Sequence, residues 1–454
     1  MREEYDSLGP VEVPAGALYG AQTQRAVDNF TLSTRPMPAP FLRNLARIKA
    51  AAARANLACG VLDAERAAAI ETAALEIAAG EHPDQFPVPV MQTGSGTSSN
   101  MNMNEVLARL AGASASLDIH PNDHVNCSQS SNDIIPACIQ LSALAQLHED
   151  VLPALQRLIE GIRGRADELS GVVKTGRTHL MDAMPLTLGQ ELGAWAAQLE
   201  EVAERLRECL PRLRLLPIGG SAVGTGVNVP TGFATRAVDE LGALCGVELG
   251  LANNPFARMA GQDVALECSS GVRALATVQT KIANDLRWMS SGPLAGLAEI
   301  ELEALQPGSS IMPGKVNPVL PEAVLMAAAQ VYGNDASIAV AAQSGNFQLN
   351  VMLPLIADRL HDSLQLAAGA CDALARTVLG FKVNTERLDA QLATNPILVT
   401  ALNRHIGYEQ AARIAKRCFE ERRTVLEVAC EETDLSREEL AGLLDPRGLA
   451  HPAD

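Results

Sequence analysis

Apolar residues recur at every third or fourth position over several long stretches of the chain. In the clearest stretch, Phe256 to Met289, the side chains at this spacing are Val264, Cys268, Val272, Leu275, Val278, Ile282, Leu286 and Met289. This period is typical of an α-helix that buries one face. The pattern therefore predicts one buried helix of unusual length.

Four further stretches carry similar patterns, and most are bounded by the Gly or Pro residues that end helices. They are Ile134 to Leu169, Pro185 to Leu213, Pro321 to Gln343 and Leu349 to Leu379. Alanine and leucine are abundant, aromatic residues make up only 3 %, and alternation of β-branched residues is rare. These features favour helix over strand. We therefore expect an all-α, mainly helical fold with a central bundle of five long helices.

The segments on either side of the bundle differ from it. Residues 1–130 mix short helical patterns with Pro- and Gly-rich turns, and residues 389–454 are typical of short charged helices. We predict three domains, 1–130, 131–388 and 389–454. The bundle helices greatly exceed the usual length of about 11 to 12 residues, and no apolar run reaches the roughly 18 residues of a membrane span. A bundle shared between subunits is the remaining interpretation.

Charge and cysteine content exclude several classes of partner. The chain has 36 Lys and Arg against 53 Asp and Glu, a formal charge of −17, which argues against nucleic acid or an anionic membrane as a partner. Its nine cysteines form neither a C-x-x-C pair nor a cluster with metal-ligand spacing, which indicates reduced thiols. Glu3, Glu4 and Asp6 are unlike a basic transit peptide. We expect a cytoplasmic protein with no metal.

Three polar, Gly-containing stretches interrupt the helical pattern and suit an oxygen-rich anion. The first, Thr93 to Asn104, is explained equally well as an ordinary N-cap turn. The second is His120 to Asp133, where His120 and His124 have metal-ligand spacing. A proline between them favours a hydrogen-bonded turn over a metal site. A related segment, Gly219 to Gly226, lacks the Lys of a phosphate loop, so a tight turn between helices is the better interpretation.

The third polar stretch runs from Gln306 to Pro318 and contains two serines between Gly308 and Gly314. Glycines at both ends permit a mobile lid. Lys315 and Asn317 could clamp a carboxylate while a serine hydroxyl faces the adjacent carbon, as the removal of a proton α to a carboxylate requires. A plain Gly/Pro loop with a solvated lysine is the alternative.

Residues 306–318 resemble the signature of the fumarase/aspartase superfamily, whose members break a C–O or C–N bond β to a carboxylate and commonly release fumarate. The resemblance continues over nearly the whole chain. It includes Gly20 to Arg25, Gln92 to Glu105, His120 to Asp133, Gly176 to Leu180, Pro185 to Glu191 and Leu402 to Tyr408. Within the superfamily, the chain is most similar to the class II fumarases, which contain no metal.

This resemblance implies a lyase that reversibly hydrates fumarate to L-malate in the tricarboxylic acid cycle, with no cofactor. It also implies a homotetramer whose central helices pack into a twenty-helix core. Each active site would then be assembled from three subunits. Such an assembly agrees with the length of the predicted helices.

The family motifs also imply roles for individual residues. Ser309 would take the C3 proton of malate, and His179, paired with Glu322, would hold the water at C2. The substrate pocket would comprise Ser95, Gly96, Thr97, Ser130, Ser131, Asn132, Thr178, Ser310, Lys315, Val316 and Asn317. A second, non-catalytic dicarboxylate site would comprise His120, Pro121, Asn122 and Asp123. A lone histidine in a helical protein is more often a core residue, but the polar neighbours of His179 disfavour that alternative.

Some positions depart from the fumarase pattern. Cys127 stands where fumarases commonly have Lys, and Leu294 stands where they commonly have Arg. The segments Val319 to Pro321 and Gly333 to Asp335 are more similar to aspartases. An aspartate ammonia-lyase, which releases fumarate and ammonia, is therefore the first alternative function.

Other positions favour hydration of fumarate. His179 stands where aspartases typically have Gln, and the segments Gly20 to Arg25 and His405 to Tyr408 are similar to fumarases. A non-catalytic relative, comparable to lyases recruited as structural lens proteins, is an alternative of another class. The joint presence of Ser309, His179 and the other catalytic side chains disfavours it.

Overall fold

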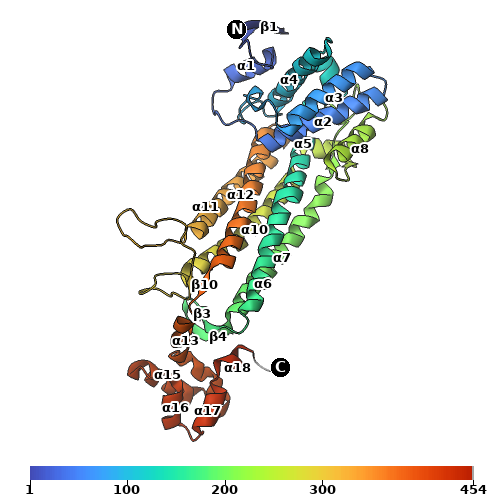
Figure 1. Ribbon diagram of the computed structural model, residues 1–454. Helices are drawn as coiled ribbons and strands as arrows, with labels where there is room; N and C mark the ends of the chain where they lie inside the picture. The colour runs from blue at the N-terminus through green and yellow to red at the C-terminus, as the bar shows by residue number, and fades with distance from the viewer. Residues whose placement is uncertain (452–454) are drawn as a thin grey trace. The chain divides into compact units, whose positions relative to one another are not determined.

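The computed structural model describes residues 1–451, which are mainly helical as predicted (Figure 1). The chain divides into two compact units. Unit 1 comprises Met1–Pro153, Ala203–Ala276 and Ala328–Ala368. Unit 2 comprises Ala154–Val202, Thr277–Ala327 and the chain from Gly369 onward. The predicted division into 1–130, 131–388 and 389–454 stays a prediction.

All five predicted long stretches are helical over most of their length. The helices are α5 (Ser131–Gln146), α6 (Leu152–Glu168), α7 (Leu188–Leu213), α10 (Asp263–Met289), α11 (Val319–Ala342) and α12 (Leu353–Gly380). A short π-helical segment, Leu147–Val151, joins α5 to α6. The stripe predicted on α10 is buried, except for Val278, which is half-buried. Periodicity thus identified the buried face correctly.

The predicted start of the α10 helix at Phe256 was wrong. Residues Pro255–Ala260 form a separate helix, α9, which ends before Gly261. A Cβ on Gly261 would lie 2.6 Å from the carbonyl oxygen of Ala257, so only glycine fits this close turn. The chain therefore turns at Gly261 before α10 begins.

The structure also contains strands that the sequence patterns did not predict. They pair two at a time in the described part of the chain. The antiparallel pairs are β1 (Arg2–Asp6) with β2 (Gly9–Val13), β3 (Val173–Thr178) with β4 (Met181–Thr187), β7 (Ile300–Glu301) with β10 (Lys382–Val383), and β8 (Gly345–Asn346) with β9 (Leu349–Asn350). The pair β5 (Leu215–Leu216) with β6 (Gly250–Leu251) is parallel. Because β4 ends at Thr187, α7 begins at Leu188 and not at the predicted Pro185.

Unit 1 also contains several shorter helices. They are α1 (Ala21–Asn29), α2 (Ala39–Ala58), α3 (Ala64–Ala79), α4 (Thr97–Ala115) and α8 (Phe233–Cys245), with a 3-10 turn at Pro83–Gln85 and a π-helical turn at Pro121–Val125. Helix α2 packs against both α3 and α8 (Figure 1). Half of its buried side chains are alanines, such as Ala46, Ala50 and Ala53, which let neighbouring helices approach closely.

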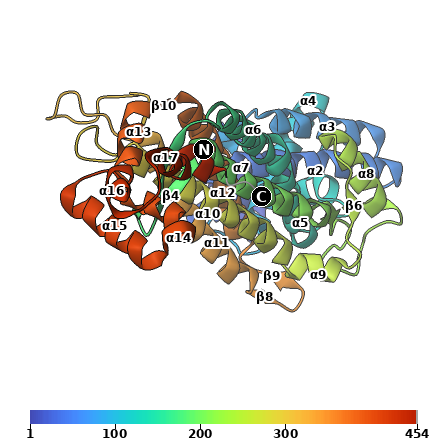
Figure 2. The same cartoon turned by 90° about the horizontal axis from the view of Figure 1, so that it is seen from below.

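The C-terminal helices of unit 2 gather around a hydrophobic cluster of their own (Figure 1 and Figure 2). They are α13 (Thr385–Ala393), a 3-10 helix (Pro396–Leu402), α14 (Asn403–Ile406), α15 (Tyr408–Glu421), α16 (Val425–Glu432), α17 (Arg437–Leu443) and α18 (Pro446–Ala450). Leu402, Ile414, Val428 and Leu440 are fully buried in this cluster. The short helices expected after residue 389 are thus confirmed.

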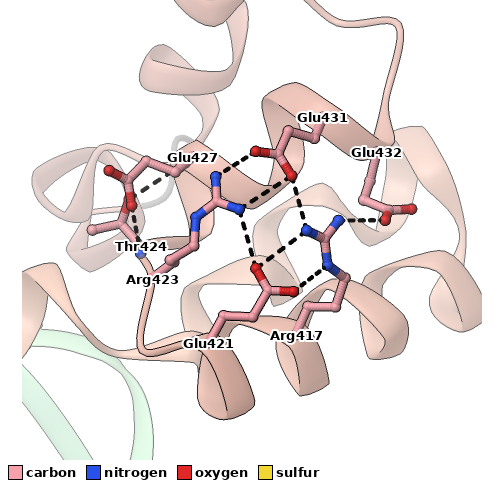
Figure 3. Close-up of polar contacts among 7 residues, drawn as sticks. All are labelled: Arg417, Glu421, Arg423, Thr424, Glu427, Glu431 and Glu432. Carbon is pink, nitrogen blue, oxygen red and sulfur yellow. Dashed lines mark hydrogen bonds and ion pairs between the residues drawn. The ribbon is translucent and has the colours of Figure 1, made fainter.

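Exposed ion pairs connect α15 to α16 (Figure 3). Arg417 lies 2.8 Å from Glu421, 2.8 Å from Glu431 and 2.6 Å from Glu432. Arg423 lies 3.1 Å from Glu421 and 2.5 Å from Glu431. Arg423 and then Arg417 lower the pKa of Glu431 to about 2. Five charges therefore form one network, and Arg417 contacts three of its carboxylates.

We expect Arg417→Met to lower the melting temperature at neutral pH and low salt. The difference from the wild type should shrink in 1 M NaCl, because exposed ion pairs are screened. A carboxylate with a depressed pKa stabilises the fold above its ordinary pKa, here 4.5, and loses this effect as the pH falls toward about 2. The difference should therefore also shrink between those pH values. Calorimetry over salt and pH measures both trends.

The matched control is Lys416→Met, which removes a neighbouring cation whose Nζ lies 3.7 Å from Glu420. Its melting temperature should stay close to that of the wild type. Equal shifts for the two variants would contradict a specific contribution of the Arg417 network.

Candidate functional site

The predicted site residues fall into two groups, one in each unit. Unit 1 contains the first two polar stretches, Thr93 to Asn104 and His120 to Asp133. Unit 2 contains Arg177 to Leu180 and the third stretch, Gln306 to Pro318.

The first polar stretch forms the turn that starts α4. Gly96 precedes the helix with a left-handed φ of 73°, and Ser95 Oγ lies 2.7 Å from Thr97 Oγ1. A Cβ on Gly96 would lie 2.9 Å from the side chain of Ile135 in α5. Two features therefore require glycine at position 96: the left-handed φ angle and the close approach of the Ile135 side chain.

The second polar stretch ends at the N-terminus of α5. Ser130 Oγ accepts a hydrogen bond from the Asn132 N–H at 3.2 Å, and Asp133 accepts one from the Ser130 N–H at 2.9 Å. The buried Ser131 Oγ accepts a bond from Asn100 Nδ2 of α4 at 3.2 Å. The structure thus brings the first two stretches together, where two helix N-termini and several hydroxyls favour an anion.

Asp133 also organises the Gly-rich segment Gly219 to Gly226. Its side chain is fully buried, and Oδ2 accepts hydrogen bonds from the N–H groups of Gly219 and Ser221, both at 3.0 Å. Burial raises the pKa of Asp133 to about 6, while backbone N–H donors, including those of Ser130, Ser221 and Gly219, oppose this shift. Two amides of this segment therefore bind a carboxylate of the chain itself, which agrees with the prediction that it is no phosphate loop.

Lys49 of α2 is a buried candidate functional residue that no sequence pattern indicated. Its Nζ donates to Asn126 Oδ1 at 3.1 Å and to Gln129 Oε1 at 3.0 Å, within the second stretch. Burial lowers the pKa of Lys49 to about 7, opposed by the charge of Asp133. Lys49 thereby ties the second stretch to α2. The available signal was a single lysine in an alanine-rich apolar segment.

The residues of the predicted second dicarboxylate site lie in a π-helical turn and its cap. His120 Nδ1 accepts a hydrogen bond from the Asp123 N–H at 3.1 Å, and His124 Nδ1 accepts one from the His120 N–H at 2.8 Å. His120, Asn122 and Asp123 are exposed, and His120 and Pro121 line a cavity of about 480 Å³. Between residues 1 and 451, no group of three or more His, Cys, Asp or Glu side chains could hold a metal ion.

In unit 2, His179 lies at the tip of the β3–β4 hairpin. Thr178 pairs with Met181, so His179 and Leu180 alone form the turn, with left-handed φ angles of 56° and 63°. These angles are typical of a type I′ turn, which favours Asn and Gly. Thr178, His179 and Leu180 are all exposed. His179 is therefore not a core histidine.

The third polar stretch is a loop closed at its base. The Gly308 N–H donates to the Lys315 carbonyl at 2.9 Å, and Asn317 Nδ2 donates to the Gly308 carbonyl at 2.7 Å. A Cβ on Gly308 would lie 2.2 Å from the Lys315 carbonyl oxygen. Only glycine fits at position 308. The two hydrogen bonds hold the ends of the loop together, with Ser309 and Ser310 between them.

Ser309 lies inside this loop and is half-buried. Its Oγ accepts hydrogen bonds from the N–H groups of Ile311 at 3.2 Å and Met312 at 3.1 Å. Donors aimed at an oxygen favour its charged form over the neutral one. Ser310 and Val316 are exposed on the same loop. The local backbone thus favours the ionised form of Ser309, which is the form that can accept a proton.

Glu322 lies exposed in the first turn of α11. Among the described residues of one chain, no hydrogen bond or ion pair joins Glu322 to His179 or to Ser309. The His179–Glu322 pair therefore stays a prediction.

Family models match most of the chain. One described as lyase matches residues 9–333, and one described as fumarase C C-terminus matches residues 398–451. The chain is 56 % identical to the class II fumarate hydratase of Xylella fastidiosa, over 99 % of this chain and 95 % of the relative. The chain belongs to the class II fumarase family. Class II fumarate hydratase 2 of Pseudomonas aeruginosa is 55 % identical, over 99 % and 98 % of the two chains.

A solved structure agrees with this membership. The class II fumarase from Schistosoma mansoni has 37 % sequence identity and a TM-score of 0.96, with 100 % of both chains covered. The resemblance inferred from the sequence motifs is confirmed. Cys127, Leu294 and the aspartase-like segments Val319 to Pro321 and Gly333 to Asp335 are therefore features of a member of the class II fumarase family.

Proposed function

We propose that the chain catalyses the reversible hydration of fumarate to L-malate. The observation that carries this function is the identity of 56 % over 99 % of the chain to a relative named class II fumarate hydratase. The alternatives, an aspartate ammonia-lyase and a non-catalytic relative, are not favoured. The loop that holds Ser309 would supply the base and the carboxylate-binding side chains of this reaction.

Removal of the C3 proton of malate is the difficult step, because a carbon next to a carboxylate is only weakly acidic. We assign the proton acceptor as Ser309 Oγ, which two backbone N–H groups already favour in its charged form. The electron pair of the broken C–H bond moves into the adjacent carboxylate. Lys315 and Asn317 would stabilise the added charge there, and Ser310 would contribute a backbone donor.

Loss of hydroxide from C2 then requires a proton. We assign this assistance to His179, oriented by Glu322, since imidazole can donate or accept a proton near neutral pH. Both side chains are exposed and do not pair within one chain. We therefore propose that each site combines His179 of one subunit with Glu322 of another.

The substrate carboxylates would bind where α4 and α5 begin. Helix N-termini and hydroxyl groups stabilise carboxylates there without a metal. The residues assigned to this site in one subunit are Ser95, Gly96, Thr97, Ser130, Ser131 and Asn132. We propose that other subunits supply Thr178 and Val316. We assign the second dicarboxylate site to His120, Pro121, Asn122 and Asp123.

We further propose a homotetramer. Helix α11 bears large apolar side chains that the chain leaves exposed: Met326 is 69 % exposed and Val340 is 56 % exposed. A second copy of the chain is the partner that would cover this helix, as the proposed shared site requires.

A cytoplasmic location and a role in the tricarboxylic acid cycle complete the proposal. All nine cysteines are free thiols, which fits a reducing compartment. Within residues 1–451, no helix is both long and apolar enough to cross a membrane.

The proposed activity can be tested with L-malate and L-aspartate as rival substrates. We expect fumarate to form from L-malate, and the chelator-treated protein to retain this activity. Absorbance in the fumarate band measures both reactions. Deamination of L-aspartate without activity on L-malate would contradict the proposal.

We expect Ser309→Ala to lower kcat by about 10²- to 10⁴-fold with substrate affinity largely kept, since one positioned acid or base group contributes about this much. Steady-state kinetics separates the two parameters. Ser114→Ala, at an exposed serine near the C-terminal end of α4, is the control for a lost hydroxyl. Turnover near that of the wild type in Ser309→Ala would move the role of base to another group.

The tetramer proposal predicts a mass near four times 47.9 kDa at micromolar concentration. Sedimentation or light scattering measures it directly. A monomer with full activity would exclude the shared site.

A further inference from the structure

Two cations of strand β3 and two carboxylates from outside the hairpin form a cluster that is largely removed from water. Lys174 has a side chain that is 2 % exposed, and its Nζ lies 2.7 Å from Glu191 Oε2 and 2.7 Å from Glu299 Oε2. Glu299 is 1 % exposed, and its Oε1 also lies 2.7 Å from Arg177 Nη1, an ion pair without hydrogen-bond geometry. Two cations and two carboxylates therefore balance each other.

A bulge in the hairpin lies between the two cations, Lys174 and Arg177. Residues three apart in a regular strand point to opposite faces of a sheet, which would separate Lys174 from Arg177. The register shifts between Thr175, which pairs with Pro185, and Arg177, which pairs with Asp182, so Gly176 of β3 lies opposite two residues of β4. A Cβ on Gly176 would lie 2.5 Å from the Met184 carbonyl oxygen, so the bulge accepts only glycine. A bulge increases the local twist of the strands, and Lys174 and Arg177 both reach Glu299.

The hairpin needs such an anchor because its turn is unfavourable. Leu180, like His179, has a left-handed φ, although a Cβ disfavours this conformation. Leu180 is 63 % exposed, so packing within the chain does little to hold it. Arg177, whose guanidinium forms an ion pair with Glu299, lies only two residues before His179. The cluster of ion pairs therefore extends to within two residues of His179, whose imidazole is exposed.

We propose that Lys174 and Glu299 are positioning residues for the hydration reaction. Through Arg177 they hold the strained turn, so that the His179 imidazole keeps its working position. This inference rests on the role of His179 under the proposed function. Each buried charge in the cluster has a partner of opposite sign, and removal of one leaves another uncompensated, so the geometry has little freedom.

The test is Lys174→Met, which keeps the length of the side chain and removes its charge. We expect kcat to fall about 10- to 100-fold while KM changes less than about 3-fold, because a small displacement of a reacting group costs about this much. The matched control is Arg163→Met, which removes an exposed ion pair with Glu200 in the same unit. Its kcat should stay within about twofold of the wild type.

Rescue distinguishes positioning from plain stabilisation. Glycine accepts a left-handed φ, so Leu180→Gly should restore kcat of Lys174→Met at least about fivefold, and should change the otherwise wild-type enzyme less than about twofold. If Lys174→Met only lost stability, its folded fraction would fall and Leu180→Gly would not restore kcat. Failure of the rescue, or a loss of turnover that only follows the folded fraction, overturns the proposal. Glu299→Gln carries the same expectations should Lys174→Met not fold.

Two further measurements separate this inference from the proposed function. His179→Gln should cripple turnover; if it does not, the role of His179 and this inference both fall. If His179→Gln loses turnover and Lys174→Met keeps the turnover of the wild type, only the inference about Lys174 and Glu299 is wrong. NMR resonances of the His179 imidazole, assigned by their absence in His179→Gln, should shift in Lys174→Met and return with Leu180→Gly, independently of any activity. Unchanged resonances in Lys174→Met overturn the inference.

Discussion

Charges that leave water must find partners, and this constraint shapes both units of the chain. In unit 1, the buried carboxylate of Asp133 collects three backbone N–H groups and thereby fixes the start of α5 and the Gly-rich segment near Gly219. In unit 2, Lys174 and Glu299 meet the same requirement beside the β3–β4 hairpin. Buried ions therefore hold the start of α5, the Gly-rich segment Gly219 to Gly226 and the β3–β4 hairpin.

The long helices could be predicted because their signal is local. A stripe of apolar residues every three or four positions is sufficient to identify α10, and its buried face was predicted correctly except at the half-buried Val278. The position at which a helix ends depends on backbone contacts that the pattern of apolar residues does not reveal. Gly261 ends α9 through a close approach to Ala257, and no periodic pattern reports that contact.

The hairpin and parts of the site could not be predicted for a related reason. In β3, the consecutive buried residues Lys174, Thr175 and Gly176 interrupt the alternation by which strands are recognised. The polar stretches were found correctly as helix starts and loops, because capping residues and glycines are local signals. Lys49 was missed because its partners lie far along the chain. The proposed partnership of His179 with Glu322 requires a second subunit, which one sequence pattern cannot place.

The hydrophobic cluster of the C-terminal helices also reaches the hairpin. Val173, the first residue of β3, packs against this cluster, and Gln190 at the start of α7 donates to the Ala450 carbonyl of α18 at 2.9 Å. Opening of the C-terminal helices would therefore uncover the base of the strand that leads to His179. Amide hydrogen exchange in β3 should then be limited by the local stability of the last helices, a cooperative unit that begins more than two hundred residues later in the chain.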